Sequence, residues 1–245
     1  MKIRLLIYTL LYGFTLPLLS QPSGREIVSL IDKNLTAKTR IMSAKMIING
    51  ARGSRTIEFN SWSEGENRAF TEYTNPAREK GTKMLKLEDK LWIFSPSTDR
   101  IIQITGQMLK QSVMGSDLSY EDMMDDPDLT SHYDPAVIGE EELDGRECWI
   151  LQLNALTDEE AYQVRKMWID QQRYVPLREE LYAKSGKLLK RTDLSDVRMI
   201  QGRWFPMKVN YKDMLKAGDG TQFIIDDIRL DETIPESLFS KASLK

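Results

Sequence analysis

The stretch KMLKLEDKLWIFSP, residues 83–96, decides the fold of this chain. Two short apolar runs flank the charged residues 88–90, and this arrangement predicts two β-strands joined by a tight turn. Segments with the two-residue period of a β-strand follow one another from Ile41 almost to the end of the sequence. The chain is therefore predicted to be mainly β, with its strands linked in sequence.

Further strand segments lie on both sides of this hairpin. Turn-forming pairs such as Asp144-Gly145, Ser185-Gly186 and Gln201-Gly202 separate them, and no alternation of strands with helices indicates a parallel sheet. We expect an antiparallel meander of about ten to twelve strands, which must curl because a flat open sheet of that size is disfavoured. The other predicted strands lie within residues 55–62, 67–73, 99–105, 146–155, 164–172, 176–183, 187–200, 203–214 and 221–230.

A curled sheet must have its concave side filled, covered or left open for a ligand. Residues 23–38 are predicted to form one covering helix, because Ile27, Ile31 and Leu35 recur at helical spacing. Ser23 followed by Glu26 matches the capping box that starts a helix.

A second cover is predicted in QSVMGSDLSYEDMMDDPD, residues 111–128. Ser119 followed by Asp122 matches a helix start, and Leu118 and Met123 can share an apolar face. The aspartates lack the alternate spacing of a calcium loop, so we expect them on the solvated end and face of a short helix. Residues 116–128 are thus predicted to be a flap whose apolar side faces the cavity.

The first twenty residues have the pattern of a signal peptide. A short basic start precedes the apolar run at residues 5–19, and Ser20 offers a small residue at a cleavage site. A transmembrane anchor is the alternative, but the run contains Pro17 and is shorter than the roughly 20 apolar residues that a span needs. No cysteine lies near this junction, so a lipid anchor on an acylated cysteine is not expected. The mature chain, residues 21–245, is expected to be one domain in an extracytoplasmic compartment after removal of residues 1–20.

Composition narrows the function further. The 34 basic and 37 acidic residues nearly balance, which gives no indication of a nucleic-acid partner. The single cysteine, Cys148, cannot form an internal disulfide and is predicted to be a buried strand thiol. The single histidine, His132, has no serine-elbow motif near it, and no ligand pair or glycine-rich loop indicates a metal or cofactor. Neither an enzyme nor a cofactor is predicted.

Soft apolar side chains are the remaining signal. The sequence holds twelve methionines and five tryptophans, and methionine adapts its shape to apolar partners without fixed geometry. These residues are expected either to fill a β core or to line a site for flexible chains.

Several motifs, taken together and in order, resemble the outer-membrane lipoprotein-sorting proteins of the LolA-like superfamily, in a branch outside the classical proteobacterial carriers. The resemblance runs from about residue 24 to residue 244. The motifs are YTNPAREKGTKML, LWIFSPSTDRIIQI, MGSDLSYEDM, DGRECWILQL, MWIDQQRYVPLREELYAKSGKLLKRTDLSDV, GRWFPMKVNYKDM and IPESLFSKASL.

The resemblance implies an incomplete antiparallel β-barrel whose open side is covered by short lid helices. It implies a periplasmic carrier or chaperone for acyl chains of lipoproteins or another lipid, with an inner-membrane donor and an outer-membrane acceptor as partners. The alternative is a lipid- or lipoprotein-sensing regulatory subunit of an envelope stress system. By residue type and place, we expect the cavity to be lined by Trp62, Phe70, Leu85, Trp92, Phe94, Ile102, Met114, Leu118 and Met123.

Overall fold

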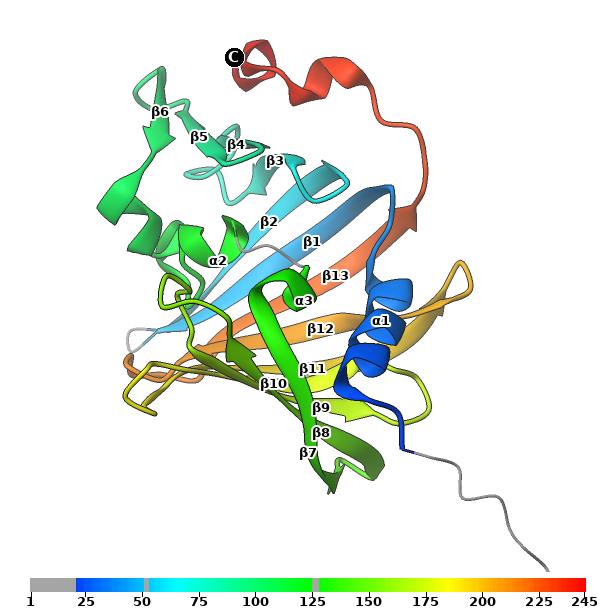
Figure 1. Cartoon of the computed structure of the whole chain (residues 1–245). Coiled ribbons are helices and arrows are strands. Elements are labelled where there is room, and N and C mark those ends of the chain that lie inside the picture. Colours follow the sequence, from blue (N-terminus) through cyan, green and yellow to red (C-terminus); the bar gives the residue numbers. More distant parts are fainter. Residues whose placement is uncertain (1–20, 51–52, 125–127) are drawn as a thin grey trace, which may run out of the picture.

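The computed structural model describes residues 21–50, 53–124 and 128–245 (Figure 1). The predicted signal peptide, residues 1–20, lies outside the described residues. The rest is built on one open antiparallel sheet, which confirms the predicted fold class, although the sheet has 13 strands rather than ten to twelve. The strands are β1 (Thr39–Gly50), β2 (Gly53–Glu64), β3 (Arg68–Asn75), β4 (Lys83–Leu87), β5 (Lys90–Ser95), β6 (Arg100–Ile104), β7 (Tyr133–Leu143), β8 (Arg146–Ala155), β9 (Val164–Asp170), β10 (Pro176–Tyr182), β11 (Leu188–Ile200), β12 (Arg203–Asp213) and β13 (Gly220–Leu230).

The strand order shows how the first and last strands of the open sheet come together. It runs β6-β5-β4-β3-β2-β1-β13-β12-β11-β10-β9-β8-β7, so every pair of neighbours is consecutive in sequence except β1 and β13. These two strands pair antiparallel in the middle of the sheet. The edge strands β6 and β7 are consecutive in sequence but lie at opposite edges. The connection between them, residues 105–132, must therefore cross from one edge to the other.

The sheet has two apolar faces. We call the face toward α1 (Gly24–Leu35), α2 (Tyr120–Met124) and α3 (Leu129–His132) the inner face (Figure 1). Because side chains alternate along a strand, β1 and β2 send Met46 and Phe59 into an inner-face core that also contains Phe205 and Ile228. A second inner-face core joins α1 to strands β7–β9.

Helix α1 starts at the predicted place. Ser23 and Glu26 form the capping box, with the Ser23 amide donating to Glu26 Oε2 at 2.7 Å. The helix buries Ile27 and Ile31 and lies so close to β7 that a Cβ on Gly24 would collide with the Pro135 carbonyl. The predicted helical cover from residues 23–38 is thus confirmed over Gly24–Leu35.

The crossing connection is mostly irregular. It contains the short turns η1 (Gly106–Lys110) and η2 (Val113–Gly115), and then α2 and α3. The predicted helix start is present, because the Ser119 amide donates to Asp122 Oδ2 at 2.7 Å. The helix that follows, Tyr120–Met124, is shorter than the predicted flap, and residues 125–127 of that flap lie outside the described residues.

The outer face of β2–β5 is covered by the C-terminal segment. Cross-strand neighbours Trp62, Phe70, Leu85 and Trp92 form one row on this face, because their strands pair in that register. The turns η3 (Glu236–Phe239) and η4 (Lys241–Leu244) lie over the row (Figure 1). We call residues 231–245 the C-terminal strap.

Polar contacts fix the strap at both turns. Arg68 forms an ion pair with Glu236 and lies 4.5 Å from the ring centroid of Phe239. Lys83 Nζ donates to the Ser243 carbonyl at 2.9 Å, so a lysine of β4 holds the end of the strap.

Phe239→Ala should lower the free energy of unfolding by about 3 kcal/mol, because it removes a buried aromatic ring between the strap and the outer face. Urea denaturation monitored by tryptophan fluorescence would measure the change. The matched control is Leu215→Ala, an exposed apolar side chain for which the change should stay within about 0.5 kcal/mol. Equal effects of the two substitutions would show that the strap contributes nothing to the fold.

Candidate functional site

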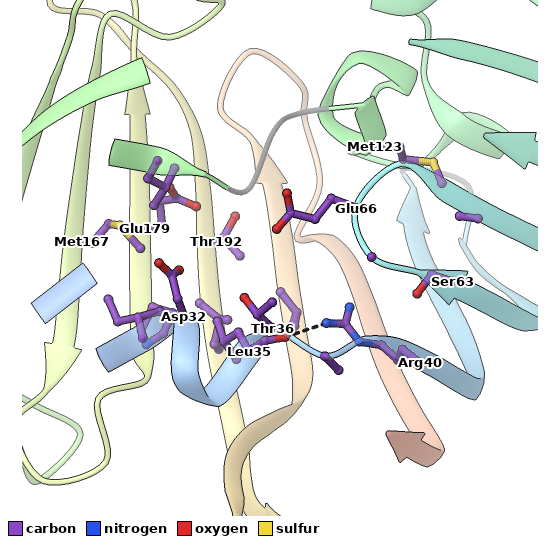
Figure 2. Close-up of a pocket in the computed structure, with 18 of the residues that line it drawn as sticks. Asp32, Leu35, Thr36, Arg40, Ser63, Glu66, Met123, Met167, Glu179 and Thr192 are labelled. Carbon is purple, nitrogen blue, oxygen red and sulfur yellow. Dashed lines mark hydrogen bonds between the residues drawn. The ribbon is translucent and has the colours of Figure 1, made fainter. Parts of the chain in front are cut away.

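A cavity lies between the inner face and the helices. Its volume is about 490 Å³, within the range of about 300–1,000 Å³ that proteins use for small-molecule ligands. Residues of α1, the β2–β3 turn, α2, α3 and strands β9–β12 surround it (Figure 2). Its apolar lining includes Ile31, Leu35, Ala69, Met123, Leu129, Met167, Leu194 and Val209.

A second, smaller cavity adjoins the first. Its volume is about 260 Å³, and it shares Leu35, Arg40, Val209 and Tyr211 with the larger cavity. Its other lining residues are Met42, Phe205, Pro206, Phe223 and Ile225, all of which are apolar. The inner face thus carries a hollow made of two adjoining cavities, of which the smaller is the more apolar.

Arg40 lies at the junction of the two cavities. It projects from β1 on the inner face, and its Nη2 donates to the Leu35 carbonyl at the C-terminal end of α1, at 2.7 Å (Figure 2). Cations are favourable at this end of a helix. Burial lowers the pKa of the guanidinium, and the charge of Arg203 lowers it further.

Carboxylates occupy a different part of the larger cavity. Asp32 projects from α1 and Glu66 from the β2–β3 turn (Figure 2). Burial raises the pKa of Asp32, and the negative charges of Asp128 and Glu66 raise it further. The larger cavity thus has carboxylates in its lining together with the cations Arg68, Lys86 and Arg165, whereas Arg40 supplies positive charge next to the apolar part.

Asp122 anchors the crossing connection to the sheet. It forms an ion pair with Lys190 of β11 and accepts a hydrogen bond from Tyr162 Oη at 2.7 Å. Burial alone would raise the pKa of this carboxyl, but the charge of Lys190 and hydrogen bonds from Lys190, Ser119 and Tyr162 outweigh it and lower the pKa.

The expectation that the aspartates of this segment face solvent is wrong for two of them. The Asp122 side chain is only 16% exposed, and Asp117 is buried. Asp117 accepts hydrogen bonds from Thr221 Oγ1 at 2.9 Å and from the Asp213 amide at 3.1 Å. Both carboxylates hold the connection against strands that lie far away in sequence, whereas Asp128 is exposed as expected.

The nine predicted lining residues fall into separate places. Only Met123, which is 37% exposed, lines the larger cavity among them. Ile102 lies 46% exposed on edge strand β6, and Met114 and Leu118 lie half-buried in the crossing connection. The structure brings together Trp62, Phe70, Leu85, Trp92 and Phe94, but it places them on the outer face beneath the C-terminal strap.

Sequence reasoning missed most of the cavity lining. The apolar positions of α1 were recognised, but their contact with Met167 and Val209 joins segments far apart in the chain. The apolar C-terminal segment that contains Leu238, Phe239 and Leu244 was the available signal for a second covered face.

The single cysteine and the single histidine both lie outside the cavity lining. Cys148 is buried in β8, which confirms the expectation, and burial raises the pKa of its thiol to about 11. His132 Nδ1 lies 2.9 Å from Glu160 Oε1. Within the described ranges, no group of three or more His, Cys, Asp or Glu residues is placed to hold a metal ion. Among the same residues, no helix is both long and apolar enough to span a bilayer.

Asp122→Asn should lower the free energy of unfolding at pH 7 by about 2 kcal/mol, because it removes the ionic partner of Lys190. The folded-state pKa of Asp122 lies below its unfolded value. The stabilisation is therefore present above about pH 4 and is lost as the pH falls through the folded-state pKa.

Urea midpoints of the wild type and the variant from pH 7 to pH 2.5 would measure this difference. Asp196→Asn is the control, because Asp196 forms an exposed ion pair with Arg198 and should contribute less than about 1 kcal/mol. A difference for Asp122→Asn that stays constant down to pH 2.5 would contradict the assignment.

Comparisons with known proteins agree with this architecture. A protein-family model with the description "Uncharacterized protein" matches residues 65–245, which is well over half of the chain. No curated protein matches the sequence.

Three solved structures share the fold over almost their whole length. A domain from Vibrio parahaemolyticus described as an outer membrane lipoprotein-sorting protein domain has a TM-score of 0.79 at 22% identity, covering 90% of this chain and 97% of its own. A DUF1329 family protein from Desulfovibrio piger has a TM-score of 0.80 at 25% identity, covering 91% and 98%. A LolA superfamily protein from Nitrosomonas europaea has a TM-score of 0.74 at 22% identity, covering 91% and 100%. The chain therefore belongs to the family whose model spans residues 65–245, and its fold is that of the LolA-like outer-membrane lipoprotein-sorting proteins.

Proposed function

We propose that the protein is a carrier that binds lipid acyl chains in the cavity between the inner face and helices α1 and α2. The observation that carries the proposal is the cavity of about 490 Å³, which apolar side chains of α1, α2, α3 and the sheet line together. The LolA-like fold supports the same function, because the similar structures include an outer membrane lipoprotein-sorting protein domain. The cargo is proposed to be the acyl chains of lipoproteins or of another lipid.

Transfer of lipid chains from water into such a cavity is favourable. Each buried CH₂ group contributes about 0.8 kcal/mol, so even one acyl chain provides a strong drive. Met123 and Met167 line the cavity with flexible thioethers, which adapt to chains without fixed geometry. Helix α2 is short, packs Tyr120 and Met124 against the inner-face core, and is tied to the sheet by the ion pair between Asp122 and Lys190, so the cavity has a fixed wall on this side.

The proposed site of action is the periplasm. The signal-peptide pattern of residues 1–20 supports export, and the fold supports exchange of cargo with an inner-membrane donor and an outer-membrane acceptor. The proposal assigns no catalytic step to the protein. His132, the single histidine, is paired with Glu160 and does not line the cavity.

Mass spectrometry of the purified protein under native conditions tests the proposal directly. We expect a population with added mass that organic extraction identifies as lipid. A protein that never carries lipid, and that binds no acyl-chain probe after delipidation, would overturn the carrier function.

Ala69→Trp should reduce binding of a fluorescent acyl-chain probe by about tenfold or more, because an indole from β3 would fill part of the larger cavity. Folding should persist, since the new ring enters a hollow rather than a packed core. Fluorescence titration measures the affinity and circular dichroism the fold.

The matched control is Ala136→Trp, which adds the same ring at an exposed position of edge strand β7. Its affinity should equal that of the wild type. Equal affinities for all three proteins would show that the chains bind elsewhere.

A further inference from the structure

Arg40 carries a charge that the protein itself does not neutralise. In the described part of the chain, its guanidinium forms no ion pair with a carboxylate, and its one hydrogen bond is donated by Nη2 to the Leu35 carbonyl. Its Nε is buried and has no hydrogen-bond partner among the described residues. The group cannot lose its charge to relieve this, because arginine stays protonated in proteins.

Arg203 lies near Arg40 and, unlike Arg40, has both a hydrogen bond to the end of α1 and a counter-ion. Arg203 Nη1 donates to the Thr36 carbonyl at 2.7 Å, one residue beyond the carbonyl that Arg40 binds. Arg203 is also paired with Asp231 at 2.6 Å, and it lines neither of the two cavities. Both arginines therefore hold the end of α1, but only Arg40 lacks a counter-ion and lines the cavity.

The position of Arg40 separates two kinds of surface. On one side, the smaller cavity offers Met42, Phe205, Phe223 and Ile225, which suit an acyl chain. The guanidinium lies where this apolar part meets the larger, more polar cavity. Asp32 and Glu66 also line the larger cavity, but within the described residues neither forms an ion pair with Arg40.

We propose that the ligand of this hollow is an amphiphile with an anionic head, a carboxylate or a phosphate, which Arg40 binds while the apolar chain lies in the smaller cavity. This inference rests on the proposed function and specifies its ligand class. A cation that is partly removed from water, as the half-buried Arg40 is, is stabilised by a paired anion, and the planar guanidinium matches the oxygens of both head groups. A neutral ester-linked chain would leave Arg40 without a counter-ion.

The test uses the delipidated mature protein and isothermal titration calorimetry. The probes are palmitate, hexadecyl phosphate, methyl palmitate, and acetate and inorganic phosphate without a chain. We expect palmitate and hexadecyl phosphate to bind at least about tenfold more tightly than methyl palmitate, because a charge-assisted hydrogen bond is lost with the neutral ester. Acetate and inorganic phosphate should bind too weakly to detect.

Arg40→Gln should weaken palmitate binding by about tenfold or more and leave methyl palmitate binding unchanged. Arg203→Gln is the matched control, because it removes the other arginine at the end of α1 without touching the cavities. It should leave both affinities unchanged. Arg40→Lys should keep the preference for anions, and it serves in place of Arg40→Gln if that variant does not fold.

The outcomes separate this inference from the carrier function. Equal affinity for palmitate and methyl palmitate overturns the anionic head but supports acyl-chain binding. Equal losses in Arg40→Gln and Arg203→Gln show that Arg40 only caps α1, which also overturns the inference. Acetate or inorganic phosphate binding as tightly as palmitate shows an anion site without a chain site. Absence of binding by every chain-bearing probe overturns the carrier function itself.

Discussion

The structure depends on one topological constraint, namely that the chain must pass from one edge of the sheet to the other between β6 and β7. All other strands that are consecutive in sequence are also neighbours in the sheet. The first and last strands, β1 and β13, pair in the middle of the sheet. The crossing segment cannot extend the sheet, so it passes over the inner face and supplies α2 and α3 as part of the cavity wall. An irregular segment brings polar backbone groups that need partners. The Asp117 amide donates to Thr221 Oγ1 at 3.0 Å and the Ser119 amide to Asp122 Oδ2 at 2.7 Å. The carboxylates of Asp117 and Asp122 also tie the segment to distant strands.

The same sheet uses its two faces differently. The inner face combines packed cores with a hollow, whereas the outer face of β2–β5 is closed by the C-terminal strap. Helix α1 on the inner face packs into a core with β7–β9 and also borders the hollow. The outer face can thus stabilise the fold while the inner face leaves space for a ligand. Arg40, which has no counter-ion among the described residues, makes one end of the smaller cavity positively charged and leaves the rest apolar.

The sequence predicted the strands well and their faces poorly, for a physical reason. The hairpin at residues 83–96 and the helix start at Ser23 follow local rules of turn and capping, and both are present. In β5, however, Leu91 and Trp92 are both apolar, and alternation alone does not say which of them faces the helices. Residue type places the row that contains Trp92 at the cavity, because it does not show that the C-terminal strap covers this row.

The burial of Asp122 was beyond local sequence rules for a different reason. Its partners Lys190 and Tyr162 lie 68 and 40 residues away, so no short motif links them. The predicted capping pair with Ser119 was correct, yet the same carboxylate also binds the sheet. Local patterns thus identified the element, and only the fold identified its role.

The pairing of β1 with β13 also has a consequence for how the chain becomes a protein. Each half of the sheet is built from neighbouring hairpins of low contact order, whereas the central seam joins strands from opposite ends of the domain. While the polypeptide emerges from a ribosome or a membrane pore, β1 presents an unpaired edge until the last strand has arrived. Free strand edges pair readily with other chains. Strand β1, which lies in the middle of the folded sheet, is thus an aggregation-prone edge strand in the partly synthesised chain. Synthesis from the N-terminus leaves this edge unpaired until β13 has been made.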